Sequence, residues 1–226
     1  APRPQGGETL AVNASAPLPL FDQQLKKAEA AFAKWNAAAN RREILARAAA
    51  GAGDDLAEIF RVASAIYAQN FEAVRELPGP TGESNSLRMK GRGVVACLGG
   101  GSPAANRKQI ALALAAGNAV LCASQIGDRA TDALSKAGAP GDLVTGLAIG
   151  PAVHEAALLD IRVRAVVFDG AEASRDAILA ALARRDGPIA PLLSSLDAPW
   201  RFAVERTLTI NTTAAGGDVR LLSLPE

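Results

Sequence analysis

The chain has 226 residues, 49% of them apolar and 4% aromatic, which is enough for one large domain with a hydrophobic core. Lys and Arg (24) nearly balance Asp and Glu (23), so no basic field argues for nucleic-acid binding. The longest apolar stretch, residues 110–126, is interrupted by Gly117-Asn118 and by Ser124-Gln125, so no membrane span is predicted.

Residues 1–20 form the first segment and are rich in proline, glycine and small polar side chains. We expect an interdomain linker without regular structure. The chain starts without an initiator Met or a signal-peptide pattern, which suggests a piece of a longer polypeptide. Cys97 and Cys122 lie inside apolar runs, which suits the reducing cytoplasm better than a disulfide framework.

Three helices are predicted after the linker. Phe21, Leu25, Ala28, Phe32 and Trp35 recur at spacings of four and three, the pattern of an amphipathic helix. A second helix spans about residues 41–50 and ends at "GAGD".

The third helix is expected to be the longest. Asp54 or Asp55 can accept hydrogen bonds from its first amides. Its apolar stripe runs from Leu56 to Leu77, and Pro78 and Pro80 end it because proline cannot continue a helical hydrogen-bond ladder.

Short β-rich runs alternate with helices in the next part of the chain. The runs cover residues 93–100, 118–124, 142–148 and 164–170, and the helices cover 104–117, 128–138, 152–160 and about 173–185. This alternation predicts an α/β fold, a Rossmann-like parallel sheet with helices on both faces. The N-terminal helices precede it, and a β-strand or hairpin tail follows it.

The tail begins with "RTLTIN". Leu208 and Ile210 alternate with Thr207, Thr209 and Asn211, the period-two pattern of a half-buried strand. Gly216-Gly217 permit a turn into a second strand, "DVRLLSL". Because an isolated hairpin is only marginally stable, we expect another surface to complete it by strand addition or docking.

The turn "CLGGGSPAAN" contains the candidate cofactor-binding residues. Gly99, Gly100, Gly101 and Ser102 follow the first parallel strand, where free amides can cradle a phosphate. The turn is not a complete G-x-G-x-x-G motif. A tightly packed strand-to-helix turn needs glycines as well, and we favour that structural interpretation.

No residue of the chain is predicted to be catalytic or to bind a metal. His154 is the only histidine, and one His with two strand-embedded Cys cannot complete a typical zinc site. The cysteines lack an obvious setting that would lower their pKa. Glu155 with Asp160, and Asp169 with Glu172, fall at helix ends, where carboxylates interact with the terminal dipole.

Three stretches resemble aldehyde dehydrogenases. They are "AEAAFAKWNAAANRREILARAA", "ALAAGNAVLCAS" and "VVFDG". The resemblance implies the fold, but Ala123 stands where the family has a ribose-binding Lys, Ile126 stands near the position of an acid, and Ala171 replaces a Ser. The family's catalytic half, with its nucleophilic Cys and acidic base, has no counterpart in this chain.

Two longer stretches, "LPGPTGESNSLRMKGRG" and "ERTLTINTTAAGGD", resemble proline utilization A, a family of bifunctional bacterial flavoenzymes that oxidise proline to glutamate. The resemblance implies the non-catalytic, aldehyde dehydrogenase-like domain at the C-terminus of long members. Such a domain seals the channel for the pyrroline-5-carboxylate or semialdehyde intermediate and braces the dehydrogenase module. FAD and NAD would then belong to the parent enzyme, with no cofactor in this chain.

The resemblance divides the chain into a linker (1–20), an aldehyde dehydrogenase-like domain (21–204) and a C-terminal motif (205–226). The expected partner is the dehydrogenase module, and a homo-oligomer through the tail is a second expectation. A degenerate nucleotide-binding regulatory domain is the main alternative, and an enzyme using Cys97 or Cys122 is the last. The expected tunnel-sealing residues are Glu205, Arg206, Thr207, Leu208, Thr209, Ile210, Asn211, Thr212, Thr213, Gly216 and Gly217.

Overall fold

A computed structural model describes residues 19–147 and 151–211. Residues 1–18 of the predicted linker lie outside this range. The second strand of the predicted hairpin and four of the expected tunnel-sealing residues, Thr212, Thr213, Gly216 and Gly217, also lie outside it.

The N-terminal helices are α1 (Pro19–Ala37), α2 (Arg41–Gly51) and α3 (Asp54–Asn70). Helix α1 begins inside the segment expected to be linker, with proline at its first position, where no amide partner is lost. The predicted stripe of α1 is buried, except for the partly buried Phe32. Trp35 donates from Nε1 to the Leu114 carbonyl (3.1 Å), which fixes α1 to the central part of the fold.

Helix α3 ends seven residues earlier than the sequence pattern suggested. Its last turn closes at Asn70, and the amides of Phe71 and Glu72 both donate to the Tyr67 carbonyl. Residues Arg75–Leu77 form strand β1 instead. The apolar spacing was misleading here because Val74 is exposed, and the backbone gains ladder hydrogen bonds by pairing with a neighbouring strand.

A five-stranded parallel sheet forms the core, with strand order β5-β4-β3-β6-β7. All four predicted runs are strands of it: β3 (Val94–Cys97), β4 (Ala119–Ala123), β5 (Val144–Leu147) and β6 (Val163–Val167). Strand β7 (Leu192–Leu193) was not predicted because two residues carry no periodicity. The strands are buried because helices flank the sheet, as the Rossmann-like prediction requires.

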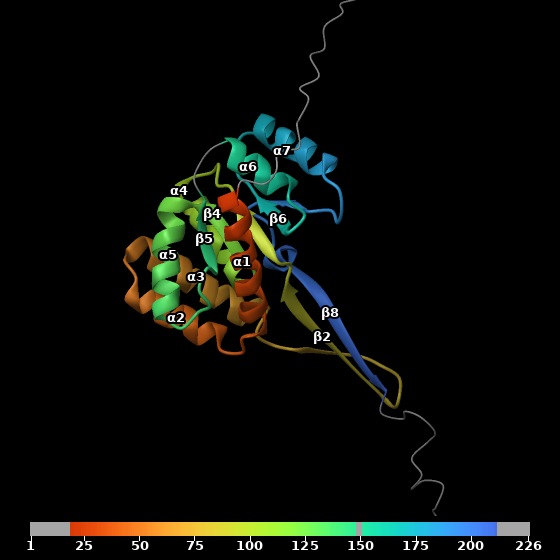
Figure 1. Ribbon diagram of the computed structural model, residues 1–226. Helices are drawn as coiled ribbons and strands as arrows, with labels where there is room; N and C mark the ends of the chain where they lie inside the picture. Colours follow the sequence, from red (N-terminus) through yellow and green to blue (C-terminus); the bar gives the residue numbers. More distant parts are fainter. Residues whose placement is uncertain (1–18, 148–150, 212–226) are drawn as a thin grey trace, which may run out of the picture.

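The remaining helices are α4 (Pro103–Ala115), α5 (Ser124–Lys136), α6 (Pro151–Leu159), α7 (Glu172–Arg184) and the short 3-10 helix η1 (Pro199–Phe202). Helices α4 and α5 pack on the sheet, and α2 and α3 form a further layer on them. Helix α1 packs against β3, β4 and β5, while α6 and α7 lie together near β6 (Figure 1).

A second sheet, of order β1-β2-β8, is antiparallel. Strand β2 (Glu83–Gly91) pairs with β8 (Ala203–Asn211) along its whole length, from Glu83 opposite Asn211 to Gly91 opposite Ala203. The two strands extend away from the body of the molecule as a long arm (Figure 1). We call β2 and β8 together the flap.

Candidate functional site

The first candidate site lies at the switch point of the parallel sheet. Strand β3 has β4 on one side and β6 on the other, so the connections after β3 and β6 leave in opposite directions and a crevice forms between them. A pocket of about 370 Å³ lies there. Its lining includes Gly101, Ser102, Asp169, Arg175, Ser194 and Ser195.

The glycine turn after β3 has structural reasons for its composition. Gly99 and Gly100 have φ values of +76° and +85°, which favour glycine. A Cβ atom on Gly100 would lie 2.5 Å from Phe168 Cε2 and 2.7 Å from the Gly170 nitrogen. Packing alone therefore requires glycine at this position.

Two amides of the same turn are already engaged by side chains. The Gly99 amide donates to Gln109 Oε1 (3.1 Å), and the Gly101 amide donates to Asn106 Oδ1 (3.2 Å). Ser102 caps helix α4, because its Oγ accepts from the Ala105 amide. A phosphate at this turn would have to displace the side-chain acceptors, so the geometry favours the structural interpretation.

Asp169 is the centre of a polar network that the sequence pattern did not reveal. Its Oδ1 accepts from Ser194 Oγ (2.6 Å) and the Ser195 amide (2.9 Å), and its Oδ2 accepts from Gln109 Nε2 (2.6 Å). The expected role of Asp169 at a helix end is therefore wrong. Because the two-residue strand before Ser194 has no recognisable pattern, the sequence offered no signal that Ser194 would lie beside Asp169.

The Asp169 carboxylate is held in its charged form. Burial alone would raise its pKa, but the hydrogen bonds from Ser194, Gln109 and Ser195 outweigh burial and leave the pKa below its ordinary value. A carboxylate held in this way accepts hydrogen bonds and joins α4 to the segment after β7. It is poorly suited to donate a proton.

Asp160 also has a role different from the expected one. It pairs with Arg162 (2.6 Å), which in turn pairs with Asp22 of α1 (2.9 Å). The carboxylate therefore belongs to a three-residue ion cluster between α1 and the turn after α6. Glu172 does lie in the first turn of α7, as expected.

The thiols and the imidazole lie where the sequence analysis placed them. Cys97 and Cys122 are buried in β3 and β4. Burial raises the pKa of Cys122 to about 12 and that of Cys97 well above its usual value, so the nucleophilic thiolate is disfavoured. His154 is half-buried on α6. Within the described residues, no group of three or more His, Cys, Asp or Glu side chains is arranged to hold a metal ion.

The residues present do not fit the adenosine contacts that the resemblance would require. Ala123 is the last residue of β4, and its methyl group offers no hydrogen bond to a ribose. Ile126 lies in the first turn of α5 and is partly buried against the core. Ala171 is the N-cap of α7 and gives no side-chain cap.

The flap is the second candidate site, and it includes Glu205 to Asn211, the described part of the expected tunnel-sealing residues. All seven are exposed, including the apolar Leu208 (57%) and Ile210 (51%). The alternation of apolar and polar residues correctly predicted strand β8. The expectation that one face of this strand is buried is wrong within the described residues, because Glu205 to Asn211 are exposed on both faces. Leu208 and Ile210 lie opposite Ser86 and Ser84, so one face of the flap exposes apolar side chains next to small polar ones.

Asn118 anchors the base of the flap. Its side chain is fully buried and makes four hydrogen bonds. Oδ1 accepts from the amides of Arg92 and Gly93, just after β2, while Nδ2 donates to the carbonyls of Ala113 and Phe202, the latter just before β8. Both strands of the flap are thus joined to the sheet at one amide side chain.

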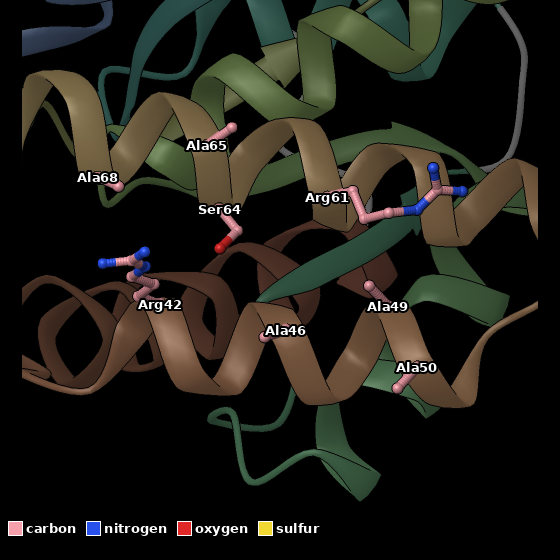
Figure 2. Close-up of a pocket in the computed structure, with 8 residues that line it drawn as sticks. All are labelled: Arg42, Ala46, Ala49, Ala50, Arg61, Ser64, Ala65 and Ala68. Atoms are coloured by element: carbon pink, nitrogen blue, oxygen red, sulfur yellow. The ribbon is translucent and has the colours of Figure 1, made fainter.

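A shallow groove of about 470 Å³ separates α2 from α3. Figure 2 shows that alanines of both helices line it, with Arg42 and Arg61 toward its two ends. Small side chains let the helices approach closely, which is a sufficient reason for this composition.

None of the helices within residues 19–147 and 151–211 is long and apolar enough to cross a membrane.

Comparisons with known proteins relate the chain to part of much longer enzymes. No family model matches it. The bifunctional protein PutA of Escherichia coli is 32% identical over 160 residues, which are 66% of this chain and 11% of that protein. A solved variant of Bradyrhizobium japonicum proline utilization A is 28% identical, with a TM-score of 0.67 over 76% of this chain and 21% of that one.

The fold alone is shared more widely. An NAD-dependent benzaldehyde dehydrogenase from Corynebacterium glutamicum is 19% identical, with a TM-score of 0.62 over 76% of this chain and 44% of that one. The chain therefore has the Rossmann-like fold of aldehyde dehydrogenases. It spans well under two thirds of each of these proteins.

Proposed function

The chain is related to an aldehyde dehydrogenase-like part of proline utilization A proteins, and we propose that it serves such an enzyme as a non-catalytic structural domain. In this role it seals the tunnel that carries the intermediate between the proline dehydrogenase and the semialdehyde dehydrogenase. It also supports the dehydrogenase module, its partner. FAD and NAD belong to the parent enzyme, which works in the bacterial cytoplasm.

The flap is the observation that carries this proposal. Its two strands extend away from the body of the molecule (Figure 1), and Leu208 and Ile210 are more than half exposed on it. Exposed apolar side chains beside polar ones suit a surface that another protein covers. Sealing a tunnel needs shape and exclusion of water, and no reactive group.

The core of the domain supports a role without chemistry. Both thiols are buried with raised pKa values, and two amides of the glycine turn are engaged. A nucleophile needs a lowered pKa and access, and a phosphate site needs free amides. The two thiols are buried in the core, and the amides of Gly99 and Gly101 already donate to side chains.

The proposal is tested in the full-length parent enzyme with the double substitution Leu208→Glu and Ile210→Glu. Each position is exposed, so the ladder with β2 is kept while the apolar face is lost. We expect coupled proline-to-glutamate flux and dehydrogenase activity to fall about fivefold or more, because burying the exposed halves of these two side chains contributes about 1.5–3 kcal/mol to docking. Flavin-dependent proline oxidation should stay nearly unchanged.

The matched control is Ala173→Glu with Ala180→Glu, at exposed positions of α7 outside the flap. It adds the same charge and leaves the apolar face of the flap intact, so its coupled flux should stay near that of the unmodified enzyme. Deletion of residues 205–226 should reproduce the loss seen in the Leu208 and Ile210 variant. Full coupled activity in both the deletion and the Leu208 and Ile210 variant would refute the tunnel-sealing role.

A degenerate nucleotide-binding regulatory domain remains the second candidate function. The pocket at the switch point favours it, because ligands of open α/β sheets bind at this place. Arg175 lines that pocket and could pair with a phosphate. The engaged amides and Ala123 argue against this candidate, and NAD titration separates the two.

A further inference from the structure

A cationic cavity of about 230 Å³ lies beside the end of β2, and none of the residues from Glu205 to Asn211 lines it. It is bounded by the end of α1, the start of α2, the end of α3 and strand β2. Three basic side chains line it, Arg41, Arg88 and Lys90, together with Tyr67. They come from segments far apart in the sequence, so the fold alone brings these charges together.

Arg41 is the buried charge of this cavity. The residue is only 5% exposed. The guanidinium lies over the Tyr67 ring, with Cζ 4.5 Å from the ring centroid, and Nε donates to the Ala38 carbonyl. Nη1 is buried and has no hydrogen-bond partner among the described residues. Nη1 lies against Gly117, which does not line the cavity, so Arg41 contributes to the cavity as a fixed, buried positive charge.

The other two cations add to the same positive potential. Lys90 donates from Nζ to the Asn36 carbonyl (3.3 Å), and burial together with Arg41 and Arg88 lowers the Lys90 pKa. Glu72 is the acidic side chain of the lining, and it pairs with Arg42 (3.4 Å), which does not line the cavity. The positive charge of the cavity is therefore not balanced by its own walls.

The start of α2 contributes to the same end of the cavity. Arg41 is the first residue of this eleven-residue helix, and Asn40, at the N-cap, makes no side-chain hydrogen bond to the first amides. The positive end of a helix dipole favours an anion nearby. This contribution adds to the basic side chains and is not needed to define the site.

We propose that this cavity binds a small oxyanion, a carboxylate or a phosphate. Arg88 and Lys90 add mobile charges to the fixed guanidinium of Arg41, and charge-assisted hydrogen bonds from such groups to an oxyanion are strong. The volume is below that of pockets for drug-sized ligands, so the ligand is a small free anion. The cavity shares strand β2 with the flap, but the proposal does not depend on the function proposed for the flap.

The experiment uses the only tyrosine of the chain as a probe. Because Tyr67 lines the cavity, the 226-residue chain labelled with 3-fluorotyrosine gives one fluorine NMR signal from this place. Sodium phosphate and sodium glutamate are titrated separately at constant ionic strength, kept with sodium chloride. The two arms distinguish a phosphate ligand from a carboxylate ligand.

We expect a saturable shift of the Tyr67 signal with at least one of the two anions. Arg88→Gln and Lys90→Gln should each weaken this binding about tenfold, as expected for loss of one charge-assisted hydrogen bond. Arg61→Gln is the matched control, since Arg61 is exposed in the groove between α2 and α3 and leaves this cavity intact. Thermal unfolding verifies that each variant is folded.

Two results would overturn the proposal. One is the absence of a saturable shift with both anions in the unmodified chain, a result that needs no variant to fold. The other is an equal loss of binding in Arg61→Gln and in the cavity variants, which would show general attraction to positive charge and no defined site.

Discussion

At the scale of single residues, the charge of Asp169 has a measurable effect on stability. Three donors hold its carboxylate, and its pKa is lowered in the folded chain. A lowered folded pKa means that the stabilisation is present above the unfolded pKa of about 3.9. It is lost as the pH falls through the lower folded value.

Asp169→Asn tests this assignment. The amide cannot accept from all the same donors, so we expect the free energy of unfolding at pH 7 to fall by about 2 kcal/mol. The difference from the unmodified chain should shrink as the pH falls below about 4, where the carboxyl group of the unfolded chain takes up a proton before the native one does. Urea unfolding at several pH values measures both effects.

The control for this substitution is Asp176→Asn, at an exposed position of α7. It should change the free energy of unfolding by no more than about 0.5 kcal/mol. A loss in Asp169→Asn that persists undiminished at pH 3 would contradict the hydrogen-bonded carboxylate.

The residue scale also shows what sequence reasoning could reach. The burial of Cys97 and Cys122 followed from the apolar runs around them. The partners of Asp169 did not follow, because Gln109 and Ser194 are far from it in the sequence and only the sheet brings them together. Arg41 and Lys90 meet for the same reason.

At the scale of secondary structure elements, the flap depends on close backbone contact at its base. A Cβ atom on Gly91 would lie 2.5 Å from the Gly117 carbonyl oxygen and 3.0 Å from Phe32 Cε2. The Gly91 amide also donates to Asn36 Oδ1 (2.9 Å). The end of β2 therefore fits against α1 and the turn before β4 only without a side chain.

Gly91→Ala should lower the free energy of unfolding by about 1–3 kcal/mol, because backbone atoms must move to admit the methyl group. Gly141→Ala is the control, since a Cβ atom added there would meet no neighbouring atom within 4 Å. The control should be neutral or slightly stabilising. Chemical unfolding of the two variants compares them, and equal stability would contradict the close contact.

Element prediction succeeded where a periodic pattern coincided with burial. The four parallel strands and helices α1, α4, α5 and α7 were predicted for this reason. Strand β2 was missed because "ESNSLRMKG" carries no β-branched or aromatic residues, which strands favour. Its conformation is set by pairing with β8 and β1.

At the scale of the whole molecule, the strand order β5-β4-β3-β6-β7 places a pocket where dinucleotides bind in related architectures. The same order arises in any sheet built by these crossovers, so it does not by itself establish a ligand. Whether a nucleotide binds depends on the residues that line the pocket. There the amides of Gly99 and Gly101 already donate to side chains.

We therefore expect no binding of NAD by the chain at micromolar concentrations. Calorimetric titration of the 226-residue chain with NAD measures this directly. A dissociation constant near 1 μM, equivalent to about −8 kcal/mol, would favour the nucleotide-binding alternative over the structural role. The tests of the flap in the full-length enzyme are separate from this result.

The pairing of β2 with β8 also orders events during synthesis on the ribosome. Glu83 pairs with Asn211, and Gly91 pairs with Ala203, so β2 emerges more than 100 residues before its partner. At translation speeds of about 5–20 residues per second, β2 waits on the order of ten seconds. Strand β1 can pair with one edge of β2 during this time, and the serines and asparagine of β2 make the edge that waits for β8 less prone to aggregation than a β-branched, apolar strand would be.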